Sequence, residues 1–262
     1  MMTALKGGEV ALSDPTYDFG GRHVLVTGGT RGFGRTIAAA FNRAGARVTI
    51  TGTQSLRSAY DASLSAFGYE RLELTDHDSI VRVAQQVGPL DVLVNAAGAR
   101  IPTSLDVHDR EFVSQAIRLG LVGPSHLANR LRYRLGESEM RGGGVIINTH
   151  SLRRWLEISH GAAAAQAEML SLTSRLGASW ARTGVRVNGV ASTAAVAHQS
   201  SLRVEIDRHS GPLLTRPRPL QSGTLQDVAQ AALFLASGGA AYITGQTLMV
   251  NGSGLGGARR SY

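Results

Sequence analysis

Residues 23–34 (HVLVTGGTRGFG) place an apolar, β-branched run directly before a glycine-rich turn, and a helix-like stretch follows from Arg35. At such a junction the unpaired backbone N–H groups and the positive end of the helix dipole converge on one point. The glycines stand at Gly28, Gly32 and Gly34, a spacing that allows a tight turn, close backbone approach and close packing of helix on strand. Because the chain holds 32 glycines, spacing alone is weak support. Its position between strand and helix favours a pyrophosphate-binding turn.

Length and composition limit the class of protein. The 262 residues are 43% hydrophobic and 18% charged, which is typical of one globular α/β domain. No apolar stretch approaches the roughly 20 residues that span a bilayer, and the first residues lack the apolar core of a signal peptide. We therefore expect a cytoplasmic protein without a membrane partner. With no cysteine and eight scattered histidines, we expect no disulfide and no metal site.

The net charge of +8 raises the question of nucleic acid. The basic residues are spread along the chain without an aromatic stacking motif, so we expect a small-molecule substrate and no nucleic-acid partner. Of the 27 basic residues only Lys6 is a lysine. A mechanism that needs an active-site lysine would have to use the N-terminal tail.

Alternation of strand-like and helix-like segments predicts the fold class. After the first strand, buried strands are predicted at 46–51, 71–74, 90–95, 144–148, 185–190 and 246–250, and helices at 77–87, 109–135, 160–181 and 224–236. Strands that alternate with helices form a parallel sheet covered on both faces. The prediction is a single-domain α/β protein with a Rossmann-type, doubly wound, seven-stranded parallel sheet, which binds ligands at the carboxyl ends of its strands.

Two segments interrupt this alternation. Residues 1–18 are interpreted as a flexible leader, and residues 19–262 as the domain. The connection at about 192–223 is long enough to be a lid, and a disordered insert is the alternative. Its basic residues favour a substrate with acidic or phenolic oxygens, although a solvated basic surface explains them equally well; they are Arg203, Arg208, Arg216, Arg218, His198 and His209.

The chain resembles the short-chain dehydrogenase/reductase family, closest to its ketoacyl-reductase-like members, over about residues 20–252. The landmarks occur in the family's order: TGGTRGFG at 27–34, LVNAAG at 93–98, GVIIN before Ser151, GVRVNGVA at 184–191 and GQTLMVNG at 245–252. This resemblance implies the predicted fold and a nicotinamide cofactor.

The resemblance also implies which residues bind the cofactor. The second strand ends at 51–53 without the carboxylate that would bind a ribose 2′-OH, and Arg31 lies in the glycine turn, so NADP(H) is favoured. A solvated turn residue is the alternative for Arg31. The implied cofactor-binding residues are Gly28, Thr30, Arg31, Gly32, Phe33, Gly34, Thr53, Glu73, Leu74, Asn95, Ala96, Ala97 and Gly98.

The family's catalytic residues are largely missing. Ser151 matches the family serine, but the Tyr and Lys positions fall on Ala162 and Gln166, and the Asn position falls on Gly120. No tyrosine occurs between Tyr133 and Tyr242, and no lysine follows Lys6, so a shifted alignment does not restore them. Candidate replacement proton donors are His150, His160 and Glu157, although histidines at such positions are more often structural.

Three functions remain open at this point. The first is a noncanonical NADPH-dependent reductase of an activated ketone with substrate-assisted proton transfer. The second is a redox-inactive partner subunit of an active homologue. The third is a redox-neutral cyclase or dehydratase. The resemblance further implies a homodimer or homotetramer assembled through the helices at 109–135 and 160–181, where small residues permit close packing.

Overall fold

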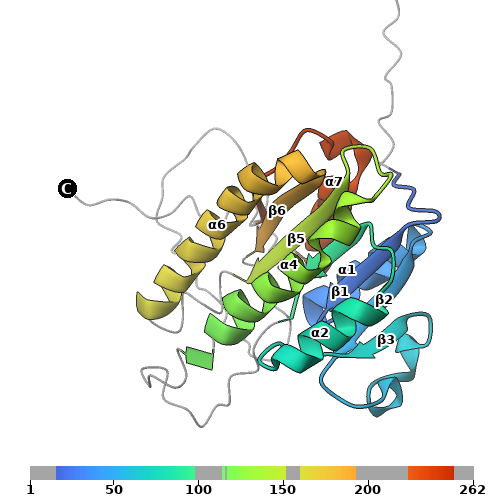
Figure 1. The fold of residues 1–262 in the computed structure, drawn as a ribbon. Coiled ribbons are helices and arrows are strands. Elements are labelled where there is room, and N and C mark those ends of the chain that lie inside the picture. The colour runs from blue at the N-terminus through green and yellow to red at the C-terminus, as the bar shows by residue number, and fades with distance from the viewer. Residues whose placement is uncertain (1–15, 98–113, 116, 152–159, 193–223, 251–262) are drawn as a thin grey trace, which may run out of the picture.

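A single parallel sheet organises the molecule (Figure 1). The computed structural model describes residues 16–97, 114–115, 117–151, 160–192 and 224–250. Seven strands pair in the order β3-β2-β1-β4-β5-β6-β7, and each adjacent pair is parallel. Their bounds are β1 His23–Thr27, β2 Arg47–Gly52, β3 Gly68–Arg71, β4 Val92–Asn95, β5 Gly144–Ser151, β6 Val185–Ser192 and β7 Thr247–Val250. The strand order reverses between β1 and β4, as the predicted fold class requires.

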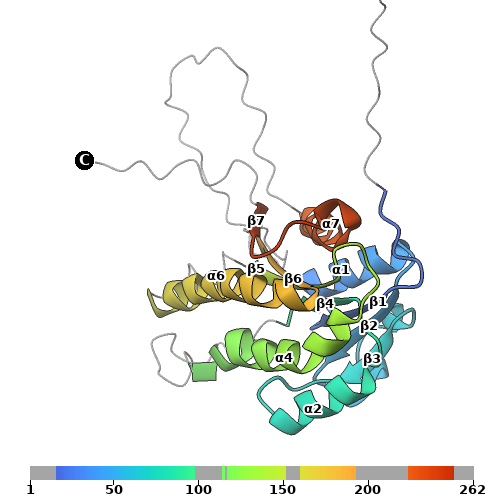
Figure 2. The ribbon, with the colours of Figure 1, turned by 45° about the horizontal axis from the view of Figure 1, so that its top comes forward.

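Helices cover both faces of the sheet (Figure 2). On one face lie α1 (Gly32–Arg43) and α7 (Leu225–Ala236). On the other lie α2 (His77–Gln86), α4 (Gly123–Gly136) and α6 (His160–Trp180). The predicted doubly wound arrangement is therefore confirmed. None of the helices in the described ranges is both long and apolar enough to cross a membrane.

Alternate side chains of the central strands enter two separate cores. Val24 and Val26 of β1 join the core under α1 and α7, whereas Leu25 joins the core under α2 and α4. β4 and β5 divide their side chains in the same way. Because both faces are covered, these strands are continuous apolar runs rather than alternating ones.

The third strand lies three residues earlier than predicted. β3 is Gly68–Arg71 rather than 71–74, and Gly68 pairs with Thr49. Leu72 and Leu74 follow the strand and are buried in the core under α2 and α4. Their apolar character therefore reflects burial after the strand rather than sheet pairing.

The helix predicted at 109–135 is not a regular α-helix where it is described. A π-helical turn, η3 (Arg118–Val122), precedes α4. Residues 98–113 lie outside the described part, as do 193–223, so the predicted lid is not among the described residues. Tyr17, assigned to the leader, packs against the core under α1 and α7.

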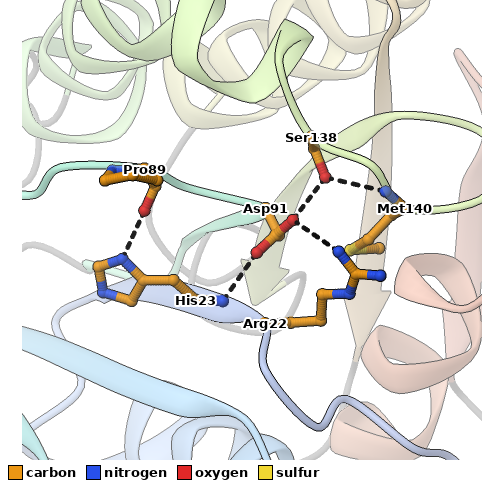
Figure 3. Close-up of polar contacts among 6 residues, drawn as sticks. All are labelled: Arg22, His23, Pro89, Asp91, Ser138 and Met140. Carbon is orange, nitrogen blue, oxygen red and sulfur yellow. Dashed lines mark hydrogen bonds and ion pairs between the residues drawn. The ribbon is translucent and has the colours of Figure 1, made fainter.

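Asp91 joins three segments at the amino edge of the sheet (Figure 3). Its Oδ2 accepts the His23 backbone N–H at 2.8 Å, and its Oδ1 accepts the Ser138 hydroxyl at 2.6 Å. Arg22 Nη1 lies 3.7 Å from the same Oδ1. These contacts fix the starts of β1 and β4 and the connection before β5 at the edge opposite the ligand-binding one.

The His23 imidazole is buried beside this cluster. Its Nδ1 lies 2.7 Å from the Pro89 carbonyl oxygen and its Nε2 lies 2.9 Å from Thr49 Oγ1. A carbonyl only accepts, so Nδ1 carries the hydrogen and Nε2 accepts from the Thr49 hydroxyl in the neutral ring. Burial lowers the pKa of His23, reinforced by Arg47 and partly opposed by the Pro89 hydrogen bond and Asp91.

We expect His23 to make the protein less stable in acid. A base with a lowered pKa in the folded state keeps its full contribution above the unfolded value of 6.5 and loses it as the pH falls from there towards the folded pKa. One such group changes the unfolding free energy by at most about 1.4 kcal/mol per pH unit. Urea unfolding at pH 7.5 and 5.5 should show a smaller acid loss in His23→Gln than in the wild type. An unchanged difference would contradict a lowered pKa, and the exposed His126→Gln serves as control.

Arg186 is a buried cation on β6, 4% exposed. Its Nη1 donates to the carbonyl oxygens of Leu235 at 2.6 Å and Ala240 at 2.9 Å. Its Nη2 donates to Ala236 at 3.3 Å and its Nε to Gly142 at 3.1 Å. Burial lowers the pKa of Arg186 to about 10, so the side chain remains charged at neutral pH. The charge lies at the carboxyl end of α7, where the helix dipole favours a cation.

Candidate functional site: the carboxyl edge of the sheet

The ends of β1 and β4 lie level with Asn148 of β5. Thr27 pairs with Asn95, and Asn95 pairs with Asn148. Because the strand order reverses between β1 and β4, this edge is where a doubly wound sheet binds its ligand. Most of the predicted cofactor-binding residues lie in the turns that leave these strands.

The glycine-rich turn has no space for side chains at two of its predicted positions. Gly28 has φ +64°, and a Cβ there would lie 2.6 Å from Ala97 Cα. A Cβ on Gly34 would lie 2.4 Å from the Gly28 carbonyl oxygen. The backbones of the turn, α1 and the β4 end are thus in direct contact, which leaves the turn's outer side as a cradle of main-chain atoms.

The start of α1 lacks the caps that other helices of this protein have. No side chain caps α1, and its first turn contains no acidic residue. In contrast, Asp76 caps α2, and Thr224 with Asp227 forms a capping box on α7. The first N–H groups of α1 therefore depend on solvent or a ligand. A dinucleotide pyrophosphate fits this cradle in charge and in donor chemistry.

The Thr27 hydroxyl holds the β4 end against the turn. Its oxygen accepts the backbone N–H groups of Ala96 at 3.1 Å and Ala97 at 3.2 Å. The hydroxyl donates to the Val94 carbonyl at 3.4 Å. The predicted residues Asn95, Ala96 and Ala97 are thereby brought beside Gly28, whereas Gly98 lies outside the described residues.

A chain of polar side chains continues across the sheet from Asn95. Asn95 Nδ2 donates to Asn148 Oδ1 at 2.9 Å, and Asn148 Nδ2 donates to Thr173 Oγ1 of α6 at 3.1 Å. The Asn95 Oδ1 atom is buried and has no hydrogen-bond partner within the described part of the chain. Asn148 and Thr173 were not predicted as site residues. The only signal was the asparagine that ends the GVIIN run.

The remaining predicted cofactor residues differ in exposure. Thr53 is exposed after β2, and its carbonyl accepts from Arg71 Nε at 3.2 Å; Arg31 is also exposed. Phe33 packs against the core under α1 and α7, and the Leu74 side chain lies in the opposite core. The Phe33 and Leu74 side chains therefore have structural roles, and contact with the cofactor would come from the backbone atoms of these residues.

Glu73 and Thr30 complete the predicted set. Glu73 Oε1 accepts the Thr75 hydroxyl at 2.9 Å, and the Glu73 N–H donates to Ser79 Oγ at 3.0 Å. Thr30, in the glycine-rich turn, is half-buried. Its methyl group lies beside Gly52 at the end of β2, where a Cβ would be 2.9 Å from it.

The predicted catalytic positions are placed by their backbones. His150 and Ser151 end β5 and pair with Ala191 and Ser192 of β6, two and three residues beyond the level of Asn148. His160 begins α6, and Ala162 and Gln166 follow in its first two turns. The side chains of these residues lie outside the described part of the structure, as does Glu157.

Gly120, which we predicted at the family's asparagine position, lies in the π-helical turn η3. Such turns are frequent at functional sites because they interrupt the regular helix ladder. The Ser125 hydroxyl donates to the Leu121 carbonyl at 2.6 Å just after this turn. The helix is therefore irregular at Gly120, which carries no polar side chain.

No group of three or more metal-ligating side chains occurs within the ranges that the structure describes. A cavity of about 550 Å³ lies at the opposite, amino edge of the sheet, lined in part by Tyr17, Arg22, Arg141 and Phe234. Because the candidate site lies at the carboxyl ends of the strands, this cavity is not part of it.

Comparison with known proteins gives a consistent result. A family model described as enoyl-(acyl carrier protein) reductase matches residues 28–254. Gluconate 5-dehydrogenase of Gluconobacter oxydans is 26% identical over 90% of this chain and 95% of its own. A solved short-chain dehydrogenase/reductase family protein superposes with a TM-score of 0.71 at 29% identity, covering 90% of this chain and 98% of its own. A gluconate 5-dehydrogenase from Burkholderia cenocepacia, solved with NADP and tartrate, gives a TM-score of 0.70 at 26% identity, covering 91% and 96%.

Proposed function

The chain belongs to the short-chain dehydrogenase/reductase family, and on that premise we propose that it is an NADP(H)-dependent reductase of an activated ketone. The uncapped start of α1 beside the Gly28–Gly34 cradle is the observation that carries the cofactor assignment. The Burkholderia cenocepacia relative solved with NADP supports it. When bound, the cofactor supplies a hydride to the substrate carbonyl.

Residues at the carboxyl edge would hold the cofactor in a fixed place. The backbone of the turn from Gly28 to Gly34 would bind the pyrophosphate, and Arg31 with Thr53 would bind the 2′-phosphate. Glu73 and Leu74 would contact the adenine through the loop after β3, and residues 95–98 would lie along the adenosine. Each assignment follows the resemblance, and those of the assigned residues that the structure describes support it by lying towards the carboxyl edge of the sheet.

We propose that Ser151 donates a hydrogen bond to the carbonyl oxygen as negative charge develops on it. By the resemblance, the positions of the family's tyrosine and lysine fall on Ala162 and Gln166. A substrate hydroxyl next to the carbonyl would therefore pass its own proton to that oxygen while the carbonyl carbon gains the hydride. Quinone-like, 1,3-dicarbonyl and hydroxyaryl ketones suit this chemistry, because they are electrophilic and carry an acidic neighbouring group.

Without the tyrosine that serves as the family's proton donor, two other functions must also be tested. A redox-inactive partner subunit would bind cofactor or a homologous chain without turnover, and a redox-neutral cyclase or dehydratase would convert substrate without consuming NADPH. Purified protein incubated with NADPH and activated ketones separates these cases. Oxidation of NADPH supports the reductase, whereas binding without oxidation by any such ketone would overturn it.

We also propose a homodimer or homotetramer that uses α4 and α6. These helices lie side by side on one face of the sheet (Figure 2). Tyr133 on α4 is 72% exposed in the single chain. Solution mass at micromolar concentration tests this assembly, and a monomeric mass contradicts it.

Cofactor titration tests the assignment directly. We expect NADPH to bind at least about 10-fold more tightly than NADH, because no carboxylate at the end of β2 repels a 2′-phosphate. Arg31→Ala should weaken NADPH binding about 10-fold, since a charged hydrogen bond contributes about 1.5–3 kcal/mol. Arg43 lies in the last turn of α1, the helix that begins after Arg31, and Arg43→Ala should leave the affinities for NADPH and NADH unchanged. Equal affinities for the two cofactors in the wild type would contradict NADP(H) specificity.

A further inference from the structure

We propose that the Tyr60 hydroxyl donates a hydrogen bond to the 2′-phosphate of NADP(H), which makes Tyr60 a residue that determines cofactor specificity. This inference rests on the proposed cofactor and extends it to a residue outside the family's landmarks. Tyr60 belongs to the connection between β2 and β3, which carries two short 3₁₀ turns at Arg57–Ala59 and Ala62–Leu64.

The Tyr60 hydroxyl lies where β2 ends and the glycine-rich turn begins. A Cβ on Gly52, the last residue of β2, would be 2.5 Å from Tyr60 Oη and 2.9 Å from Thr30 Cγ2. The phenol oxygen therefore occupies the place that a side chain at position 52 would need. In this fold the residue at the end of the second strand recognises the ribose 2′ position. Tyr60 thus supplies a polar atom where Gly52 supplies none.

Among the described residues, the Tyr60 hydroxyl accepts a hydrogen bond and donates none, which leaves its hydrogen for a ligand. Tyr60 Oη accepts the Gln54 N–H at 3.0 Å, and the neighbouring Tyr69 hydroxyl donates to the Gln54 carbonyl at 2.5 Å. Burial raises the pKa of Tyr60, but the hydrogen bond received from the Gln54 N–H, together with the contacts with Thr53 and Tyr69, outweighs it and leaves the pKa below 10.0. A more acidic hydroxyl is a stronger donor to an anion.

The charges nearby favour a phosphate over a neutral hydroxyl. Residues 51–60 contain no carboxylate. Arg71 donates to the Thr53 carbonyl through Nε at 3.2 Å, which brings its guanidinium to the same strand end. The nearest acid in sequence, Asp61, is paired with Arg35 at 3.4 Å. On the neighbouring strand, Glu70 pairs with Thr51, whereas Arg71 pairs with Gly52 at the strand end itself, so an anion there would meet a cation and hydroxyl donors.

The segment that carries Tyr60 is fixed at both sides. Arg35 of α1 binds Asp61 and the Ser63 hydroxyl, and Arg57 donates to the Phe67 carbonyl at 2.6 Å. Leu64 is fully buried beneath it. Since the hydroxyl is held before a ligand arrives, its hydrogen bond requires little ordering on binding.

Titration of Tyr60→Phe with NADPH and NADH tests the inference. The change removes the hydroxyl, which also accepts the exposed Gln54 N–H, and keeps the ring, so we expect the fold to be preserved. We expect the Kd for NADPH to rise about 10-fold and the Kd for NADH to change less than about 2-fold, because the lost bond reaches a charged acceptor that only NADPH carries. Titration with 2′,5′-ADP and 5′-AMP should show the same difference without any turnover. Tyr242→Phe, a tyrosine that is 98% exposed before β7, is the matched control and should bind as the wild type does.

Two results would overturn the role of Tyr60. Equal weakening of NADPH and NADH would mean that the hydroxyl holds the adenosine and not the phosphate. Unchanged affinities would mean that it contacts neither. If the wild-type protein shows no preference for NADPH over NADH, the proposed NADP(H) specificity is itself contradicted. If the wild type prefers NADPH and Tyr60→Phe keeps that preference, only the role of Tyr60 is contradicted.

Discussion

Ser151→Ala is expected to lower kcat for ketone reduction about 10²- to 10³-fold while the Kd for NADPH stays the same. One preorganised donor to a developing oxyanion is worth about 2.7–4 kcal/mol. This protein has no tyrosine between Tyr133 and Tyr242 to provide a second donor at that oxygen. The loss in kcat should therefore fall mainly on the chemical step, measured as single-turnover oxidation of NADPH.

Ser192→Ala is the matched control for this experiment. Ser192 is paired with Ser151 at the same level of the sheet, but its hydroxyl donates to the Val250 carbonyl at 2.9 Å. Its loss should cost about 1 kcal/mol of stability and little kcat. His150→Phe and His160→Phe should keep most activity. A thousandfold loss in either one, with cofactor affinity unchanged, would identify that histidine as the acid and exclude substrate assistance.

Arg186→Met is expected to lower the unfolding free energy by about 4 kcal/mol. The methionine fills much of the volume but leaves four carbonyl oxygens, at Gly142, Leu235, Ala236 and Ala240, without this donor. Each buried acceptor left without a donor costs about 1–3 kcal/mol, and the apolar side chain recovers part of the sum. Thermal unfolding should move down by about 10 °C, since about 1 kcal/mol corresponds to 2–4 °C in a chain of this size.

Arg182→Met removes the same charge from an exposed position after α6, and we expect it to change stability by less than about 0.5 kcal/mol. NADPH affinity of the folded Arg186→Met protein should match the wild type, because α7 ends at the edge opposite the cofactor cradle. If Arg186→Met is as stable as Arg182→Met, the buried guanidinium is not what holds α7 on β6.

The sequence alone determined the strand runs and the glycine-rich turn. β1, β4 and β5 each contain a continuous apolar run, and such a run can be recognised in the sequence without knowing which strands it pairs with. Gly28 and Gly34 could be identified because the requirement for main-chain contact is local to the strand, turn and helix that carry them. The family landmarks follow from the same short-range patterns.

The tertiary structure alone decided the polar contacts between distant segments. Arg186 meets Leu235, 49 residues away, and Asn95 meets Asn148, 53 residues away. Tyr60 reaches the end of β2 only because Arg35 and the buried Leu64 hold its segment in place. Leu72 and Leu74 suggested a strand, but they are buried after β3 ends. The apolar pattern of a strand can be recognised from residues that are neighbours in sequence. The partner of a hydrogen-bonding side chain depends instead on strand order and register, and the apolar pattern does not determine either of these.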